Sequence, residues 1–306
     1  MTHAESVMMA YDMLSDGRTG LLGHGRDEFA SVIEGIDVWE SNPLVFVDFP
    51  LDGTPCHDVM GIYTGIDRSR EPSLFGPMID WYAGSPHMRG TECGIEVDTS
   101  DGNKASAYLR HAGRVDLAVP FLESIGDGDM SDEYLSVFER LPDRWFASYV
   151  ASFPERDGSP IRIGGMAASE RIGRAEWFSD SFDSIGFSAY DDGMLSFCDE
   201  LLAEGIGFEF QFDIMADGSL SDTFSISVPV IGDFKGKGML ESFAETVRRH
   251  DLADERWELL KDLWVDEVVD GTRMVVHPNN AKVKFVGRVP QVARCYVMMS
   301  MTEVVE

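Results

Sequence analysis

The chain has 306 residues, of which 44% are hydrophobic, and this is enough for a sizeable core and excludes a chain that is disordered throughout. Acidic residues outnumber basic ones by 54 to 25, and the formal charge of −29 argues against nucleic acids and anionic membranes as partners. Four scattered cysteines without metal-binding spacing favour free thiols in a reducing compartment. We find no signal-peptide pattern and no apolar run of about 18 residues, so we expect a soluble cytoplasmic protein.

Alternation of apolar and polar residues predicts many antiparallel strands, most of them in consecutive pairs. Asp-Gly dipeptides at 101–102, 157–158 and 217–218 predict hairpin turns between the members of three pairs. The predicted strands are 44–49, 57–63, 93–98, 104–110, 145–153, 161–166, 185–190, 207–215, 223–230, 282–286 and 292–299.

Helical patterns fill the gaps between the strand pairs. They predict helices at 72–82, 131–140, 194–203, 239–249 and 252–268. The unit of two strands and a helix recurs about every 50–60 residues, and no Pro-, Gly- or Ser-rich linker divides the chain. We therefore expect a single domain over residues 1–306, of the α+β class, with about ten antiparallel strands in one sheet, open or closed, and helices on one face.

Several predicted strands carry a fully polar face. In the segment from Lys104 to Arg110, the side chains of Lys104, Ser106, Tyr108 and Arg110 share one face, because alternate residues of a strand point the same way. The same alternation groups Glu209, Gln211 and Asp213, then Thr223, Ser225 and Ser227, then Lys282 and Lys284, and finally Arg294 and Tyr296. Two interpretations remain open: these faces meet bulk water, as in many antiparallel sheets, or they line the lumen of a closed barrel.

The use of lysine favours a ligand. The chain has only six lysines, and three of them, Lys104, Lys282 and Lys284, lie within predicted strands beside tyrosine and arginine. Such a cationic surface suits an anionic ligand, and a diphosphate is the natural candidate, because Lys, Arg and tyrosine hydroxyls donate to its oxygens.

Common nucleotide-binding and hydrolytic motifs are absent from the sequence: there is no GxxxxGK[ST], GxGxxG, HExxH or GxSxG. Asp191-Asp192 is not followed by an aspartate at position 195, so the DDxxD metal clamp of all-helical isoprenoid enzymes is missing as well. A diphosphate would therefore be held mainly by cationic side chains, without a protein metal site.

Three segments together resemble a known family. The hairpin from Gly94 to Arg110, with the later Ile125-Gly126-Asp127, is similar to the central hairpin of the cyanobactin-type peptide prenyltransferases. The segment from His277 to Tyr296 resembles the last hairpin of that family, and Val32–Gly35 followed by Glu40 resembles its first helix end and strand glutamate. These enzymes belong to the ABBA prenyltransferases, so the resemblance implies a closed antiparallel barrel ringed by helices.

The resemblance also implies a reaction, the transfer of a dimethylallyl or geranyl group from its diphosphate to a side chain of a ribosomal peptide. Tightly bound cofactors are not expected, although Mg²⁺ can accompany the prenyl diphosphate. Glu40 would orient and deprotonate the acceptor. The implied diphosphate-binding residues are Lys104, Arg110, Arg162, Lys282, Lys284 and Arg294, and the tyrosines implied to shield the allylic cation are Tyr108, Tyr190 and Tyr296. The alternatives are a prenyltransferase for small aromatic molecules and a non-catalytic α/β binding protein.

Overall fold

We describe the protein from a computed structural model. The described residues are 5, 8–9, 11–13, 26–27, 30, 44–52, 58–63, 76–85, 91–98, 104–167, 175–202, 207–229, 237–254 and 263–304. Three features of the sequence analysis lie outside these residues: Glu40, the predicted strand start at His57 and the predicted helix end at 32–35.

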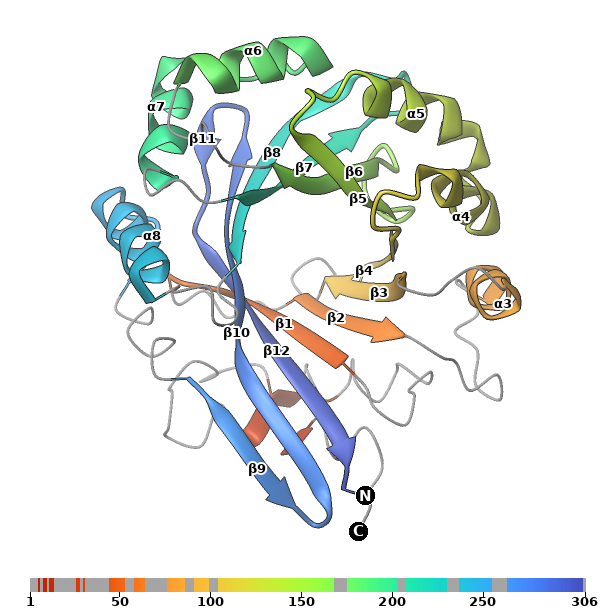
Figure 1. Ribbon diagram of the computed structural model, residues 1–306, viewed down its shortest axis with the longest axis vertical. Helices are drawn as coiled ribbons and strands as arrows, with labels where there is room; N and C mark the ends of the chain where they lie inside the picture. The colour runs from red at the N-terminus through yellow and green to blue at the C-terminus, as the bar shows by residue number, and fades with distance from the viewer. Residues whose placement is uncertain are drawn as a thin grey trace.

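One antiparallel sheet runs through the described chain (Figure 1). Its strands are β1 Leu44–Pro50, β2 Asp58–Tyr63, β3 Glu92–Asp98, β4 Lys104–Arg110, β5 Trp145–Ser152, β6 Ile161–Ala167, β7 Phe208–Ile214, β8 Leu220–Pro229, β9 Val265–Val269, β10 Thr272–Val286, β11 Val289–Pro290 and β12 Arg294–Glu303. Pairing runs in the order β10–β12–β1–β2–β3–β4–β5–β6–β7–β8, so most neighbours in space are also neighbours in sequence. This local connectivity matches the strand pairs that the sequence predicts.

The sheet curls until its two ends meet at β10. The first part of β10 pairs with β12, and the part from Asn280 to Val286 pairs with β8. Between the two, the register shifts at Pro278/Asn280, where proline has no N–H to donate to the ladder. Strand β10 has β12 on one edge and β8 on the other only over Asn280–Lys282. Over the rest of its length β10 pairs with only one of these two strands, so the barrel is open there. This corrects the expectation of a closed barrel, while the antiparallel pairing and the helical cover are confirmed.

The helices lie on the outside of the curled sheet (Figure 1). They are α3 Gly76–Gly84, α4 Ala118–Ser124, α5 Ser131–Glu139, α6 Ala175–Ile185, α7 Asp192–Leu201 and α8 Lys237–Arg249, with short 3₁₀ turns at Val115–Leu117 and Gly128–Met130. The hydrophobic core fills the space between these helices and the outer face of the sheet. The protein thus buries its apolar residues outside the barrel wall and leaves the interior of the barrel to polar ones.

Strand β7 shows how the alternation produces this arrangement. Phe208, Phe210 and Phe212 are fully buried on the outer face. Phe178 of α6 packs against Phe208 with ring centroids 5.6 Å apart, and burial of each such ring contributes about 2 kcal/mol. The intervening Glu209, Gln211 and Asp213 consequently point into the barrel.

Two elements differ from the predictions. The segment 185–190 is not a strand, because α6 continues to Ile185 and Gly186 ends it with a φ of +81°. The Phe187 N–H then donates to the Phe182 carbonyl at 2.9 Å, which is the bond pattern of a helix cap. The predicted helix 252–268 is wrong in its described C-terminal part, where β9 forms a hairpin with β10. Asp270 and Gly271, at φ of 51° and 80°, make the tight turn that an Asp-Gly pair favours.

Candidate active site

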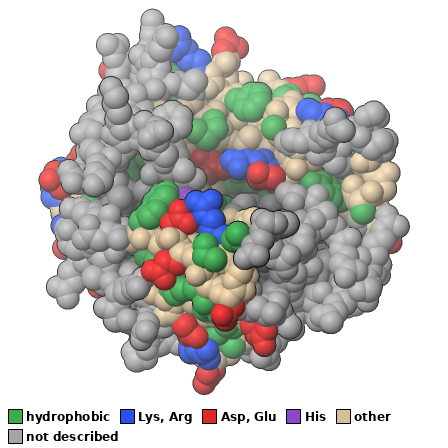
Figure 2. Space-filling model, turned by 60° about the horizontal axis from the view of Figure 1, so that its bottom comes forward, with side chains coloured by type: hydrophobic (Ala, Val, Ile, Leu, Met, Phe, Trp, Pro, Cys, Tyr) green, Lys and Arg blue, Asp and Glu red, His purple; other side chains and the backbone are tan. Residues whose placement is uncertain are grey.

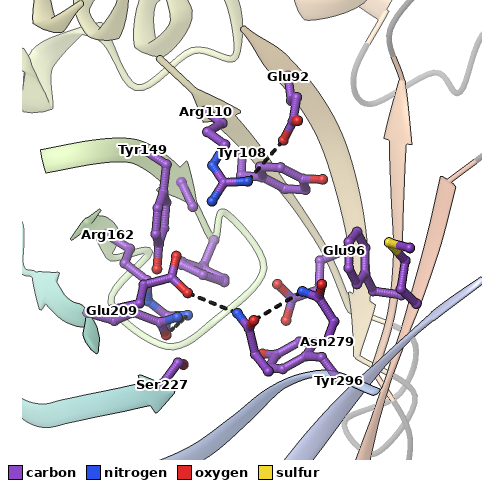
Figure 3. A pocket seen from close by; sticks show the side chains of 16 residues that line it. Glu92, Glu96, Tyr108, Arg110, Tyr149, Arg162, Glu209, Ser227, Asn279 and Tyr296 are labelled. Carbon is purple, nitrogen blue, oxygen red and sulfur yellow. Dashed lines mark hydrogen bonds and ion pairs between the residues drawn. The ribbon is translucent and has the colours of Figure 1, made fainter. Parts of the chain in front are cut away.

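A cavity of about 390 Å³ occupies the interior of the barrel. The side chains that line it come from nine of the barrel strands, and six of them belong to the polar faces that alternation predicts. Among the lining residues are Glu92, Glu96, Tyr108, Arg110, Tyr149, Arg162, Glu209, Gln211, Ser227, Asn280 and Tyr296 (Figure 3). In a view from below, basic and acidic side chains lie next to each other around a hollow (Figure 2). The polar strand faces therefore line a lumen.

The antiparallel strands give the barrel two chemically different ends. The β5–β6 turn, the β7–β8 turn and the β10–β12 connection lie at one end, which we call the turn end. The opposite end, where β4 leads into α4 and α7 leads into β7, is the helix end. The position of a residue along its strand therefore decides which end it faces.

Five cations gather towards the turn end: Arg156, Arg162, Lys282, Lys284 and Arg294. Lys284 is close enough to Arg162, Arg156 and Arg294 for their charges to lower its pKa in addition to burial. Burial and the charge of Arg162 likewise lower the pKa of Lys282, to about 8. Such mutual repulsion indicates a surface that an anion would stabilise.

The three arginines of this cluster are paired with carboxylates. Arg162 forms a two-point contact with Asp213, with Nε–Oδ1 and Nη2–Oδ2 distances of 2.6 and 3.2 Å. Burial alone would raise the pKa of Asp213, but the charge and hydrogen bonds of Arg162 lower it. The other two pairs are Arg294–Asp48 at 2.9 Å and Arg156–Glu96 at 4.0 Å.

The two lysines are different. Among the described residues no carboxylate lies within ion-pair distance of Lys282, whose Nζ donates to the Tyr296 hydroxyl at 3.2 Å. Lys282 is only 7% exposed, and Lys284, two residues further along β10, lies on the same face. A buried ammonium group without a counter-ion is costly, so an anionic ligand beside Lys282 would be stabilising. The arginines of the cluster already have carboxylate partners, and the two lysines are therefore the cations best able to bind such a ligand.

Three tyrosine rings line the cavity: Tyr108, Tyr149 and Tyr296 (Figure 3). Tyr108 lies directly opposite Gly94 of β3, and Tyr149 lies directly opposite Gly164 of β6. A Cβ atom added to either glycine would overlap the ring of its partner tyrosine. The two glycines therefore let these rings lie against the barrel wall and keep the lumen open.

The helix end carries a different set of groups. Arg110 contacts Glu92 across the β3–β4 pair at 3.3 Å. Glu209 accepts a hydrogen bond from the Asn280 side chain at 3.2 Å, and Asn279 donates to Asn280 at 3.1 Å (Figure 3). Burial raises the pKa of Glu209, and the charges of Arg110 and Lys282 oppose that effect.

The structure brings most of the predicted site residues together, but not all of them. Arg162, Lys282, Lys284 and Arg294 come together at the turn end, and Tyr108 and Tyr296 line the cavity. Arg110 lines the cavity at the helix end, and the half-buried Lys104 begins β4, opposite Asp98. Tyr190 does not lie in the lumen; its hydroxyl donates to Asp183 at 2.5 Å and its ring packs on Phe182 in the outer helical layer. Glu40 cannot be placed, because it lies outside the described residues.

Sequence reasoning missed Tyr149 and Glu96 as lumen residues, and it placed Glu209 on a polar strand face without giving it a role in the site. Tyr149 was hidden in the apolar run of β5, where a register shift between Ala147 and Tyr149 breaks the alternation. Its signal was the glycine-rich centre of β6, because a glycine inside a strand often marks the close approach of another side chain.

In the described part of the chain we find no helix with the length and apolar character that a membrane crossing requires.

No family model and no curated protein matches the sequence. Solved structures do match the fold. The prenyltransferase PriB in its apo form aligns over 97% of this chain and 95% of its own, with a TM-score of 0.56 and 12% identity. The 5-dimethylallyl tryptophan synthase from Streptomyces coelicolor, bound to DMASPP and Trp, aligns over 97% and 94%, with a TM-score of 0.54 and 13% identity.

A third structure, of NotF in complex with brevianamide F and DMSPP, aligns over 96% of this chain and 92% of its own, with a TM-score of 0.51 and 8% identity. At such low identity the likeness concerns the path of the chain, and it extends over nearly the whole length of each protein. Two of these structures hold an aromatic acceptor, Trp in one and brevianamide F in the other, and none of the three is a cyanobactin-type enzyme. The chain therefore has the fold of the ABBA-type aromatic prenyltransferases.

Proposed function

We propose that this protein is an aromatic prenyltransferase that moves a dimethylallyl group from its diphosphate to an aromatic acceptor in the lumen. The observation that carries this proposal is a pair of lysines on one face of β10, the buried Lys282 and the half-buried Lys284, which lie near three tyrosine rings. Within the described ranges neither lysine has a carboxylate at ion-pair distance. The fold supports it, because a PriB structure of the same fold was solved with L-tryptophan and dimethylallyl thiolodiphosphate.

The donor would bind with its diphosphate against Lys282 and Lys284. As the bond between C1 of the prenyl group and the bridging oxygen breaks, negative charge grows on the leaving diphosphate, and the two ammonium groups stabilise it. Arg162 and Arg294 add charge that Asp213 and Asp48 partly offset. Asp213, Asp48 and Glu96 are each engaged by an arginine, so Mg²⁺ would be held chiefly through diphosphate oxygens.

The allylic cation would lie among Tyr108, Tyr149 and Tyr296, whose ring faces stabilise positive charge and exclude water. The acceptor carbon or heteroatom then forms a bond to the prenyl carbon and loses one proton to a carboxylate. Glu40 remains our proposed base from the sequence resemblance. The ribosomal peptide acceptor and the geranyl donor of that resemblance remain hypotheses that the same experiment tests.

The test is a mass-spectrometric screen of the purified protein with dimethylallyl or geranyl diphosphate, with and without Mg²⁺. The acceptors are L-tryptophan, L-tyrosine, indole-containing cyclic dipeptides and longer peptides. We expect an indole acceptor to gain the mass of one prenyl unit. The Lys282→Met/Lys284→Met variant should lose on the order of 10²–10³ in kcat.

The matched control is Arg288→Met, which removes a positive charge from an exposed turn residue and should retain activity. Failure of every donor to bind or react with the wild-type protein would contradict the proposed function and favour a non-catalytic binding protein. Equal activity in the double-lysine variant would remove these lysines from the mechanism.

A further inference from the structure

A carboxylate, a hydroxyl and an ammonium group lie side by side in one row of the barrel wall. In the strand registers Ser227 of β8 lies directly opposite Glu209 of β7 and, on its other side, directly opposite Lys282 of β10. Residues directly opposite each other in antiparallel strands have Cβ atoms about 4.5–5.5 Å apart, so the three side chains are neighbours. Because barrel strands tilt, such a row runs obliquely across the wall, from the helix end at Glu209 towards the turn end at Lys282.

Each member of this row has bonding capacity that the described chain does not fill. The Ser227 hydroxyl lines the cavity in a residue only 1% exposed, and it has no hydrogen-bond partner among the described residues. Glu209 accepts one hydrogen bond, from Asn280 to Oε2, and within the described ranges it has no ion-pair partner. Lys282 donates to the Tyr296 hydroxyl, and no described carboxylate lies at ion-pair distance. Because buried polar groups are almost always satisfied, the row marks a place for a bound molecule.

The row as a whole has no net charge, but its two ends have opposite charge. Glu209 and Lys282 balance each other when both are ionised, and the neutral Ser227 lies between them (Figure 3 shows Glu209 and Ser227). A ligand that satisfies all three groups must therefore carry positive and negative charge close together. A divalent cation bound to a diphosphate is such a ligand, because carboxylate and hydroxyl oxygens suit the cation and an ammonium group suits the phosphoryl oxygens.

The charge balance of the surrounding cation cluster favours the same ligand. The five cations of the cluster face the three carboxylates that pair with its arginines, and Glu209 is a fourth. Burial raises the pKa of Glu209, and the charges of Arg110 and Lys282 oppose this effect. With all nine groups ionised the cluster has one net positive charge, which a diphosphate exceeds in negative charge because both of its phosphoryl groups are ionised. A divalent cation that enters with the diphosphate supplies the missing positive charge, as buried charges require.

We propose that Glu209 and Ser227 bind a Mg²⁺ ion that enters the lumen with the donor diphosphate, so that the donor substrate is the Mg²⁺–diphosphate complex. This rests on the proposed function and names the form in which the donor binds. Mg²⁺ in proteins is commonly held by one or two carboxylates together with substrate phosphates and water. The part of the chain that the structure describes has no group of 3 or more His, Cys, Asp or Glu side chains suited to a metal ion, so we expect Mg²⁺ alone to bind weakly.

The experiment measures binding of dimethylallyl thiolodiphosphate by titration calorimetry, once with excess Mg²⁺ and once with EDTA, and it needs no turnover. Mg²⁺ alone is titrated as a third arm. For the wild-type protein we expect Mg²⁺ to tighten the Kd of the diphosphate by about tenfold or more, a usual size for coupling between two ligands.

The variant Glu209→Gln separates a metal-binding role from a structural one, because it keeps the size of the side chain and can still accept from Asn280. The ratio of its Kd values with EDTA and with Mg²⁺ should approach one. In EDTA it should bind the diphosphate at least as tightly as the wild type does, because a carboxylate that repels the phosphoryl oxygens is gone. A residue with only a structural role would weaken binding in both conditions.

Two further variants keep the test decisive. Ser227→Ala should lose part of the Mg²⁺ effect and keep its affinity in EDTA, and Glu123→Gln removes an exposed carboxylate on α4 as the matched control. Equal Kd values with Mg²⁺ and with EDTA in the wild type would overturn the inference, and so would a full Mg²⁺ effect in folded Glu209→Gln. Prenyl transfer that persists in EDTA would in that case leave the proposed function standing. Mg²⁺-dependent binding that Glu209→Gln abolishes, without prenyl transfer to any acceptor, would instead contradict the proposed function and leave this site standing.

Discussion

Lys282 belongs to the cation cluster of the lumen and donates to the Tyr296 hydroxyl. Its protonation state sets the positive charge that it can offer to a diphosphate. Burial and Arg162 lower its pKa from 10.5 to about 8. A lowered pKa in a cation means that the charged form is complete well below pH 8 and is lost as the pH rises through that value. Binding an anion favours the charged form, so the affinity for the donor follows the same direction.

We therefore expect the affinity for dimethylallyl thiolodiphosphate to be nearly constant between pH 6 and 7. Above about pH 8 it should fall by up to tenfold per pH unit, because one proton must be taken up on binding. Titration calorimetry in buffers of different ionisation enthalpy measures both the Kd and the proton uptake. Lys282→Met should bind more weakly with a flatter profile; an identical pH dependence in that variant would show that another group is responsible.

The glycines opposite the tyrosines make a prediction about the width of the lumen. In Gly164→Ala the new Cβ would overlap the Tyr149 ring, and the ring has to swing from the wall into the cavity. We expect the variant to lose geranyl diphosphate binding by at least tenfold relative to dimethylallyl diphosphate, and to lose about 1–3 kcal/mol of unfolding free energy through overpacking.

Gly84→Ala is the matched control, because a Cβ there has no neighbour within 4 Å. The double variant Gly164→Ala/Tyr149→Leu should recover the longer donor, since the smaller side chain leaves room for the methyl group. If Gly164→Ala binds both donors as the wild type does, the glycine does not control the lumen width.

At the scale of elements, Asp191 has a structural role in α7. It is the N-cap residue of that helix, and its Oδ1 accepts a hydrogen bond from the Met194 N–H at 2.9 Å. Asp191 and Asp192 begin α7, which packs on the outer face of the sheet, away from the lumen. The aspartate pair therefore starts a helix, in keeping with the missing DDxxD pattern.

The variant Asp191→Ala should lose about 1 kcal/mol of unfolding free energy, the usual cost of removing such a cap. Urea denaturation measures it, and Asp191→Asn should recover most of the loss because the amide oxygen also accepts the bond. The Kd of the prenyl diphosphate should stay at the wild-type value; a Kd change in well-folded Asp191→Ala would give this residue a role in the site.

Most strands were predictable because their cause is local. The alternation in β4, β7 and β8 and the Asp-Gly turn before β8 fall within short windows. The strand predicted at 185–190 failed because Gly186 caps α6, and the helix predicted at 252–268 failed because Asp270-Gly271 turns β9 back on β10. In both places a glycine with positive φ decided the structure, and the apolar residues around it suited either element.

At the scale of the whole molecule, the chain has a formal charge of −29, yet several of its few basic side chains lie close together inside the barrel. The outer face of the sheet is covered by apolar contacts with the helices, so polar strand residues have only the interior left to occupy. Trp145, Phe212 and Phe224 belong to this outer layer, in contact with helices or neighbouring strands. The result is an interior where buried charges interact strongly because water is restricted.

The sequence by itself determined that Lys282, Lys284 and Arg294 share the polar faces of their strands, because the side-chain period of two is a property of each strand alone. It also determined the strand pairs, since tight turns join neighbours. Only the tertiary structure decided that Arg162 is paired with Asp213 and Arg294 with Asp48, that Arg110 lies at the other end of the lumen, and that β10 joins both β12 and β8. These facts depend on register and curvature between segments distant in the chain, and local sequence patterns do not encode those long-range relations.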